Sequence, residues 1–337
     1  MGTSGGSSVR WGIAGTGMIA GIFANAFAEV DGGSVVAVGS RALTSATRFA
    51  ATHAIPRAHG TYADLVADPE VDAIYVATPH AQHEELTVAA LEAGKHVLCE
   101  KPMSLSAPQS ARMVEAARAH DRFLMEALWS RFLPAYLTID ELVADGAVGE
   151  VLCVDASLGF RAPFDPDHRL FDRELGGGAL LDLGIYPVHL AHSVLGPPAA
   201  VGAAARLGPT GVDEHTVVTM EFADGALAIA HAAIRVSLSG TAIVTGTEGA
   251  IEIPMPMHCP SHLDLVRFAD GERHRTDTPP GTAPFHFEID EVHRCLAAGL
   301  TESPRLPLSA SLGIADTLDR AAAAIGLVYP EADGAAT

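Results

Sequence analysis

The chain has 337 residues, of which 48% are hydrophobic and 18% charged, and these proportions are those of an ordinary folded protein. Its length predicts two domains, because one hydrophobic core rarely serves more than roughly 250–300 residues. The net charge of −20 leaves no basic surface of the kind that binds nucleic acid or anionic membranes, so neither is an expected partner.

The first element is a strand over residues 9–13 that leads into Gly15-x-Gly17-x-x-Ala20, the spacing of a dinucleotide-binding turn. Gly15 permits the tight turn, and Gly17 lets the backbone approach a pyrophosphate. Ala20 keeps the following helix, over residues 18–29, close to the sheet. The amino terminus of that helix offers N–H groups and its dipole to the phosphates.

The second strand, over residues 34–39, ends at the position that discriminates between the two nicotinamide cofactors. An acidic residue there would bind the adenosine 2′-hydroxyl of NAD, but this chain has Ser40 and Arg41. A hydroxyl and a guanidinium suit a 2′-phosphate, so NADP is favoured over NAD. The alternative is that Arg41 is a solvated residue that leads into a helix over residues 42–53.

Helices and strands alternate up to residue 127 with short connections, which predicts a doubly wound parallel sheet in a domain over residues 9–128. Thr78 and Pro79 follow an apolar strand and are expected to line the same crevice as the glycine turn. His83 could orient the next helix or could be a buried structural histidine. The remaining expected elements are helices over 62–67, 84–93 and 107–120, and strands over 71–77, 96–99 and 123–127.

Glu100-Lys101-Pro102 lies where the strand over residues 96–99 ends, because a proline cannot donate to a ladder and restricts the residue before it. A charged pair at the carboxyl end of a buried strand is costly to hide and is usually found at a ligand crevice. The alternative is a surface ion pair that caps the loop.

The second half, residues 129–330, changes to strands joined by short turns such as Asp224-Gly225. It predicts an α+β domain whose large, mostly antiparallel open sheet is covered by helices on one face, while its C-terminal helix packs back on the first domain. The open face predicts a homodimer, with a tetramer as an alternative. The expected strands are 151–160, 199–207, 215–222, 226–235, 241–246, 249–253 and 262–268. The expected helices are 137–145, 285–298 and 309–325, together with one that residues 176–189 open and that ends near residue 196.

Within the strand over 151–160, alternate residues from Leu152 to Phe160 are expected to share one face. Asp182 and Tyr186 are four residues apart on the helix that follows the run 176–178 of three glycines, so they are expected to project together. They are candidates for an acid–base pair that works with Lys101, because an adjacent ammonium lowers the pKa of a phenol toward neutrality. The alternative is that Tyr186 is a core residue with its hydroxyl at the rim.

The four cysteines, at positions 99, 153, 259 and 295, are widely spaced and form no Cys-x-x-Cys pair. This predicts neither a disulfide framework nor a zinc site, and it suits the reducing cytoplasm, where we expect the protein to reside. The sixteen histidines form no His-Glu-x-x-His motif, so no metal is expected.

Glycines and polar residues interrupt the apolar run over 11–30, which is therefore not expected to be a signal or membrane segment. Residues 1–8 and 331–337 are expected to be disordered tails.

Taken in order from about residue 9 to 329, these motifs resemble the glucose–fructose oxidoreductase / inositol dehydrogenase / MocA family. The resemblance is carried by Gly15-Thr-Gly17-Met-Ile-Ala20, Thr78-Pro79 with His83, Glu100-Lys101-Pro102, and the stretch from Gly176 to Tyr186. Residues 125–134 and 298–304 are similar to the branch that contains NADP-dependent D-xylose 1-dehydrogenase and dimeric trans-dihydrodiol dehydrogenase.

The resemblance implies a role for each candidate residue. Lys101 would polarise the reacting oxygen beside the nicotinamide, Tyr186 would accept the proton in oxidation, and Asp182 would hold the substrate's other hydroxyls. Trp129, Arg131 and Phe160 would be walls of the substrate pocket. The cofactor residues would be Gly15, Thr16, Gly17, Met18 and Ile19 at the pyrophosphate, Ser40 and Arg41 at the 2′-phosphate, and Thr78, Pro79, His83, Glu100 and Lys101 at the nicotinamide end.

We therefore expect an NADP-dependent oxidoreductase that acts on a sugar or polyol carbinol, such as D-xylose at C1, and that uses no metal. The alternatives are a trans-dihydrodiol dehydrogenase and a reductase of keto- or anhydro-sugars. His258 stands where some dihydrodiol dehydrogenases have an aromatic residue before Cys-Pro, which disfavours an aromatic diol. An alternative of another class is a catalytically silent NADP-binding sensor.

Overall fold

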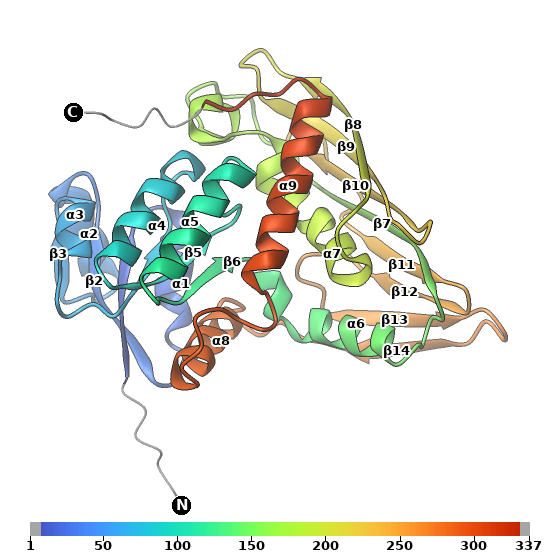
Figure 1. Cartoon of the computed structure of the whole chain (residues 1–337), viewed down its shortest axis with the longest axis horizontal. Helices are drawn as coiled ribbons and strands as arrows, with labels where there is room; N and C mark the ends of the chain where they lie inside the picture. Colours follow the sequence, from blue (N-terminus) through green and yellow to red (C-terminus); the bar gives the residue numbers. More distant parts are fainter. Residues whose placement is uncertain (1–7, 331–337) are drawn as a thin grey trace, which may run out of the picture. The chain divides into compact units, whose positions relative to one another are not determined.

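The computed structural model describes residues 8–330, so the expected tails lie outside the described residues apart from Ser8. The chain divides into two compact units, coloured along the sequence in Figure 1. The first unit takes in a late segment of the chain besides its amino-terminal part. It consists of residues 8–104, 108–129 and 282–311, and the second consists of residues 105–107, 130–281 and 312–330.

The first unit is built on a six-stranded sheet in the order β3-β2-β1-β4-β5-β6, and every adjacent pair is parallel. This confirms the doubly wound sheet predicted from the alternation of helices and strands. The carboxyl ends of β1, β4 and β5 are neighbours at one edge, where such sheets bind ligands. The strands are β1 (Val9–Ala14), β2 (Gly33–Gly39), β3 (Arg57–His59), β4 (Ala73–Val76), β5 (His96–Glu100) and β6 (Leu124–Ala127).

Buried aromatic residues fix two helices to one face of this sheet. Phe23 of α1 stacks on Tyr75 of β4 with ring centroids 3.7 Å apart. On β1, the Trp11 indole N–H donates to His293 Nε2 of α8 at 2.9 Å, which ties the late segment to the amino-terminal part. The helices are α1 (Met18–Ala26), α2 (Leu43–Thr52), α3 (Tyr62–Val66), α4 (His83–Glu92), α5 (Ala107–Ala119) and α8 (His286–Ala297).

The second unit is built on an eight-stranded sheet in the order β14-β13-β12-β11-β7-β10-β9-β8. Only the pair β7 and β10 is parallel among its described strands, so the predicted mostly antiparallel sheet is confirmed. The strands are β7 (Val151–Gly159), β8 (Ala200–Leu207), β9 (Asp213–Glu221), β10 (Leu227–Ala233), β11 (Ala242–Gly246), β12 (Gly249–Ile253), β13 (His262–Arg267) and β14 (Arg273–Asp277).

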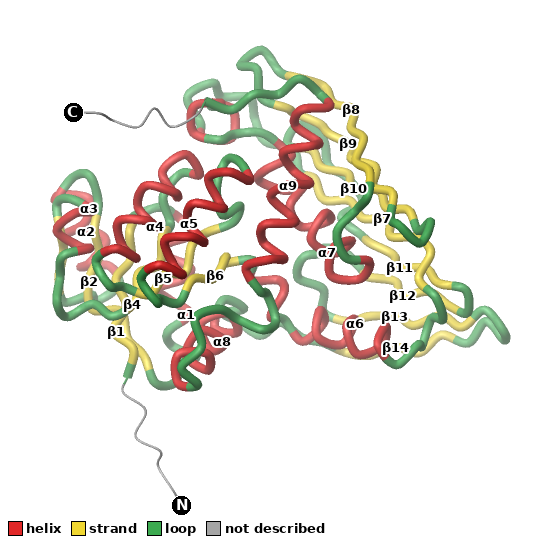
Figure 2. The backbone as a smooth tube through the Cα atoms, in the orientation of Figure 1, coloured by secondary structure: helices red, strands yellow, loops and turns green. Residues whose placement is uncertain are grey.

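Helices lie along one face of this second sheet, and the tube in Figure 2 leaves its other face without a helix. The inward row includes Val154, Val244 and Ile251, which are fully buried. The outward row runs across six strands in register, through Ile229, Asp155, Ile243, Glu252, Asp264 and Arg275. The helices are α6 (Pro134–Ala144), α7 (Ile185–Leu195) and α9 (Leu308–Ala324), the last of which begins in the first unit.

Three local features differ from the sequence-based expectations. β3 and β14 were not predicted, because β3 has three residues and β14 is Arg-His-Arg-Thr-Asp, with no apolar alternation. β14 instead pairs with β13 and is held there by ion pairs such as Arg275 Nε to Asp264 Oδ1 at 2.9 Å. Leu152 of β7 is 45% exposed because the pairing with β11 shifts register there, and Phe160 is 41% exposed because it follows the last residue of β7, although the intervening alternate residues are buried.

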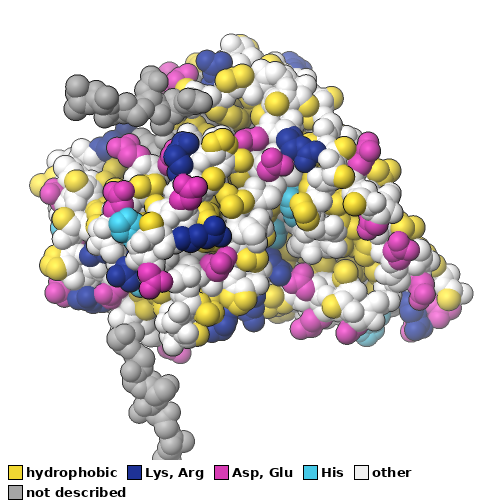
Figure 3. All heavy atoms as spheres, in the orientation of Figure 1, with side chains coloured by type: hydrophobic (Ala, Val, Ile, Leu, Met, Phe, Trp, Pro, Cys, Tyr) yellow, Lys and Arg dark blue, Asp and Glu magenta, His cyan; other side chains and the backbone are white. Residues whose placement is uncertain are grey.

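No helix among residues 8–330 is long and apolar enough to cross a membrane. On the face drawn in Figure 3, acidic and basic side chains are mixed, and no large area carries a single charge.

Candidate active site

The turn between β1 and α1 has the geometry of a phosphate cradle. Gly15 has a φ of +125°, and a Cβ added there would lie 2.5 Å from the Ala77 carbonyl oxygen. Gly17 is the N-cap of α1. No side chain of residues 8–330 caps that terminus, and a Cβ added at Gly17 would meet none of their atoms within 4 Å. Because the first N–H groups of a helix have no partners within it, this terminus fits a pyrophosphate. Thr16, Met18 and Ile19 lie in the same turn, and Met18 is 80% exposed.

The carboxyl end of β2 carries the two residues expected at a 2′-phosphate. Ser40 is buried and its backbone N–H donates to the His59 carbonyl oxygen at 3.2 Å, so the neighbouring strand β3 fixes its position. Arg41 follows at the surface and is exposed to solvent. A hydroxyl on a buried residue beside an exposed guanidinium suits recognition of a phosphate group.

Thr78 and Pro79 follow β4, at the same edge of the sheet as the Gly15 turn. The Thr78 hydroxyl is buried and has no hydrogen-bond partner in the described part of the chain, as expected of a group that serves a ligand. His83 is fully buried, and its ring nitrogens lie 2.9 Å from the carbonyl oxygens of Thr78 and Pro102. Burial lowers its pKa, and because a neutral imidazole carries one N–H, the ring donates to one of these two carbonyl oxygens at a time.

Lys101 lies on a loop whose backbone is held by three buried side chains in succession. The Lys101 N–H donates to Glu100 Oε2 at 3.2 Å, the Pro102 carbonyl faces the His83 ring, and the Met103 N–H donates to Glu126 Oε1 at 2.8 Å. Glu100 is itself held by the Tyr75 hydroxyl, which donates to Oε1. The loop is therefore fixed at the carboxyl end of β5, beside the β4 loop.

The aromatic residue expected in the pocket wall has a partner that sequence analysis missed. Trp129 contacts Phe285 with ring centroids 5.2 Å apart and an interplanar angle of 33°. Phe285 lies immediately before α8, in the segment that returns to the first unit. No local motif marks Phe285, because the two residues are 156 positions apart (285 − 129) and only the fold brings them together.

In the second unit, Asp182 lies in the turn that leads into α7, Tyr186 lies in the first turn of α7, and each contacts a residue from another segment. Asp182 is buried, and its Oδ1 accepts a hydrogen bond from Arg169 Nη1 at 3.0 Å. The buried Tyr186 ring contacts His258, with centroids 5.0 Å apart. Arg169 was missed in the sequence, since it lies in a loop with no recognisable spacing. A carboxylate, a guanidinium, a phenol and an imidazole thus form two polar pairs suited to binding hydroxyl groups.

A buried aspartate fixes the beginning of this helix. The chain enters α7 through a π-helical turn, Leu180–Gly184, instead of the regular helix expected from the glycine run. The Leu180 N–H donates to Asp213 Oδ2 at 2.7 Å, and a Cβ added at Gly178 would lie 2.1 Å from Asp213 Oδ1. A glycine at position 178 is therefore needed for close approach to Asp213, whose pKa is raised by burial to about 7.

The other two expected wall residues of this unit occupy different environments. Arg131 is mostly buried, and its Nη2 forms an ion pair of 2.6 Å with Asp140 of α6. Phe160 is partly exposed just after the end of β7.

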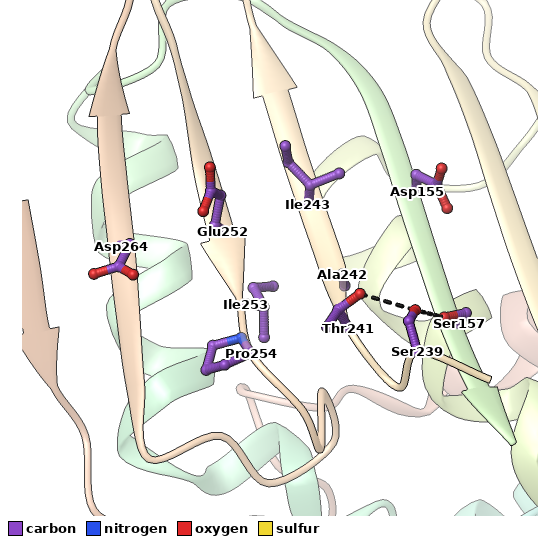
Figure 4. Close-up of a pocket in the computed structure, with 10 residues that line it drawn as sticks. All are labelled: Asp155, Ser157, Ser239, Thr241, Ala242, Ile243, Glu252, Ile253, Pro254 and Asp264. Atoms are coloured by element: carbon purple, nitrogen blue, oxygen red, sulfur yellow. Dashed lines mark hydrogen bonds between the residues drawn. The ribbon is translucent and has the colours of Figure 1, made fainter. Parts of the chain in front are cut away.

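A pocket of about 390 Å³ lies on the open face of the second sheet and contains none of the predicted site residues. Figure 4 shows it lined by residues of strands and of the loops next to them, with a chain of hydrogen bonds from Thr241 to Ser239 (3.0 Å) and on to Ser157 (2.7 Å). Its carboxylates Glu252 and Asp264 are paired with arginines of β14. Among the residues that the structure describes, no group of three or more His, Cys, Asp or Glu could hold a metal ion.

Two family models match this chain, one over its amino-terminal part and one over its later part. Residues 9–128 match the model of the GFO/IDH/MocA oxidoreductase family with its NAD-binding Rossmann fold, and residues 136–252 match the GFO/IDH/MocA C-terminal domain. Relatives include the trans-1,2-dihydrobenzene-1,2-diol dehydrogenases of Danio rerio, 38% identical over 96% of this chain and 99% of the relative, and of Homo sapiens, 37% identical over the same shares.

Solved structures that are similar to this chain are also those of oxidoreductases. The aldose-aldose oxidoreductase of Caulobacter crescentus is 27% identical, with a TM-score of 0.86 over 94% of this chain and 97% of that one. The 3-ketoreductase KijD10 of Actinomadura kijaniata, solved in complex with NADP, is 26% identical, with a TM-score of 0.84 over 94% of this chain and 98% of that one.

Proposed function

Because the chain belongs to the GFO/IDH/MocA family of oxidoreductases, we propose that it is an NADP-dependent dehydrogenase acting on a sugar or polyol carbinol. We assign cofactor binding to residues 9–128 and substrate binding to residues 129–330. The observation that carries the proposal is the position of Lys101. It lies on a clamped loop after β5, two strands along the same sheet edge from the Gly15 turn on β1.

NADP, when bound, supplies the hydride acceptor in oxidation, and the protein's own residues manage the proton and the charge. Tyr186 removes the proton of the reacting hydroxyl as general base, and Lys101 stabilises the developing alkoxide with its ammonium group. Asp182, oriented by Arg169, accepts hydrogen bonds from the neighbouring hydroxyls of the substrate. In the reductive direction the same two residues act in reverse, so that Tyr186 returns the proton.

The preference for NADP rests on Ser40 and Arg41. Replacing Arg41 with alanine is expected to weaken NADP binding about 10- to 100-fold, because a charge-assisted contact to the 2′-phosphate is lost. NAD binding should change less than about threefold. Titration with the fluorescent reduced cofactors NADPH and NADH measures both, and Arg48→Ala, at an exposed arginine on α2, serves as the matched control. Equal losses for NADP and NAD would contradict the role given to Arg41.

An aldose such as D-xylose, oxidised at C1, is the proposed substrate. Asp182 and Tyr186 of the second unit each have a polar partner, because Arg169 donates to Asp182 and the His258 ring contacts Tyr186. Such a lining favours a ligand with several hydroxyls over an aromatic ring. A cyclic trans-diol is the second candidate, favoured by the names of the curated relatives, and a keto-sugar is a third, favoured by the solved 3-ketoreductase.

Initial rates with purified protein decide among these substrates. Pentoses, hexoses and trans-dihydrodiols would each be offered with NADP or with NAD, and keto-sugars with NADPH. Turnover of D-xylose with NADP preferred supports the proposal. Higher kcat/KM for a trans-dihydrodiol moves the assignment to the second candidate, and turnover of a keto-sugar alone moves it to the third. Tight NADPH binding without turnover of any compound would instead indicate a cofactor-binding sensor.

We further propose a homodimer formed through the open face of the second sheet, with a tetramer as an alternative. Leu227 and Ile229 of β10 are 54% and 41% exposed on that face. Replacing Ile229 with aspartate is expected to weaken self-association at least about tenfold, because a charge would be buried without a partner. Sedimentation velocity should show twice the 34.9 kDa chain mass for the native protein and for the control Leu43→Asp in the first unit. A monomeric native protein would contradict the proposal.

The four cysteines are unpaired in the structure, and we propose a cytoplasmic location on this basis.

A further inference from the structure

Two histidines that the catalytic scheme above does not use face each other on the second sheet. His215 lies on β9 and His231 on β10, and their Nε2 atoms are joined by a hydrogen bond. The ring centroids are 4.7 Å apart, and the ring planes differ by 14°. Because one Nε2 must carry the proton and the other must accept it, the His215–His231 pair is an N–H···N bond between two partly buried imidazoles.

The register of the sheet places this pair on the open face, where the dimer is proposed. His231 is two residues beyond Ile229 on β10, so the two side chains share a face, and His215 lies opposite Ala233 in the same row. Ile229 is 41% exposed, and no helix lies on this face in Figure 2. A second copy that associates through Ile229 would therefore cover the His215–His231 pair.

Two facing imidazoles take up protons in two unequal steps. The first added proton turns the donor ring into an imidazolium and leaves the N–H···N bond in place. The second puts an N–H on both facing Nε2 atoms, which breaks the bond and sets two positive charges against each other. In agreement with this, burial and the charge of His215 lower the pKa of His231.

The charged groups nearest to the pair lie on β7, β8 and β9, and they are Asp155, Arg206 and Glu214. Arg206 lies opposite His215, but its Nε is 3.8 Å from Glu214 Oε2, so its positive charge is partly offset. Asp155 raises the pKa of His231 from the other side, and Ser157, the direct neighbour of His231 on β7, carries no charge. Since these neighbours oppose one another, the mutual repulsion of the two imidazoliums decides the second step.

We propose that the His215–His231 pair makes self-association of this chain sensitive to acid, because uptake of the second added proton drives two copies apart. This regulation rests on the homodimer proposed above. Covering the pair removes it from water, which disfavours the doubly charged form, so the second proton binds more weakly in the dimer than in the separate chain. Separate chains therefore hold more protons at low pH, and the equilibrium moves toward them as the pH falls.

Sedimentation equilibrium between pH 7.5 and pH 5.0 measures the dissociation constant of the dimer. The buffers have one ionic strength and contain EDTA, because paired imidazoles also bind transition metals. The dissociation constant of the native protein is expected to rise at least about tenfold over this range, since each copy contributes one pair and one linked proton. Circular dichroism at each pH separates dissociation from unfolding. A dissociation constant that does not change with pH would overturn the proposal.

The double variant His215→Gln/His231→Gln keeps two side chains that hydrogen-bond to each other and removes both titrating groups. Its dissociation constant should change less than about threefold over the same pH range. His274→Gln is the matched control and should respond as the native protein does. His274 is an exposed histidine of β14 that pairs with Leu265, in the row that faces away from the open face. A double variant that keeps the native pH response would overturn the proposal.

If the double variant does not fold, a nuclear magnetic resonance titration of the histidine ring protons in the native protein decides. His215 and His231 should titrate in two steps at least about one pH unit apart, and the step at lower pH should coincide with dissociation. Two rings that titrate together, or a lower step outside the range of dissociation, would overturn the proposal.

The proposed functions fail separately from this inference. A dimer that does not respond to pH would keep the homodimer and overturn the inference alone, whereas a native protein that is monomeric at every pH would overturn both. Dehydrogenase turnover is measured on its own, so a chain without activity whose dimer still dissociates in acid through His215 and His231 would keep the inference and lose the catalytic assignment.

Discussion

Replacing Lys101 with methionine is expected to lower kcat for alcohol oxidation by about 10²- to 10⁴-fold, while NADP affinity changes less than about threefold. Methionine has a similar length and no charge, so the variant loses the stabilisation of the alkoxide and little else. The loop should keep its position, because its anchors from Glu100, His83 and Glu126 engage backbone groups and not the lysine side chain. Steady-state kinetics and a fluorescence titration with NADPH give the two numbers.

Lys95→Met is the matched control, since it removes the chain's other lysine from the same unit. The Lys95 ammonium donates to two carbonyl oxygens, so its loss should destabilise the fold and lower the melting temperature. Turnover at 25 °C should stay within about threefold of the native value. If Lys95→Met and Lys101→Met lost activity equally, the effect would be one of stability, and Lys101 would have no special part in the chemistry.

The parallel sheet of the first unit was predictable because its signals are local. Each apolar strand is followed by a helix after a short connection, and Gly15 and Pro102 mark the ends of β1 and β5. The same sequence gives no sign of the return of α8 to this unit. That return is held by contacts between segments far apart in the chain, such as Trp11 with His293 and Trp129 with Phe285.

Burial of charged groups was the part of the site that the sequence could not reveal. Glu126, Glu288 and Asp213 look like ordinary surface acids in their segments, yet each is at most 2% exposed. Their positions follow from tertiary packing, which brings Glu126 under the Lys101 loop and Asp213 against Gly178. Lys101, Tyr186 and Asp182, by contrast, could be selected because they stand in recognisable motifs.

Replacing Tyr186 with phenylalanine is expected to lower kcat for oxidation by about 10²- to 10⁴-fold, because the general base is lost. The ring remains, so its contact with His258 and the packing at the start of α7 should persist. The rise of kcat with pH that a phenol base produces should also disappear. Rates measured between pH 6 and 10 test both expectations, and a merely structural tyrosine would lower kcat without flattening the profile.

Tyr136→Phe is the matched control for this deletion of one hydroxyl. Tyr136 is also buried in the second unit, but its hydroxyl donates to the Met257 carbonyl oxygen at 3.2 Å, so its removal should affect stability and leave the pH profile unchanged. Combining Tyr186→Phe with Lys101→Met should cost much less than the product of the two single losses, because both residues act on one proton transfer. Fully multiplicative losses would mean that the two residues act in separate steps and would contradict the scheme.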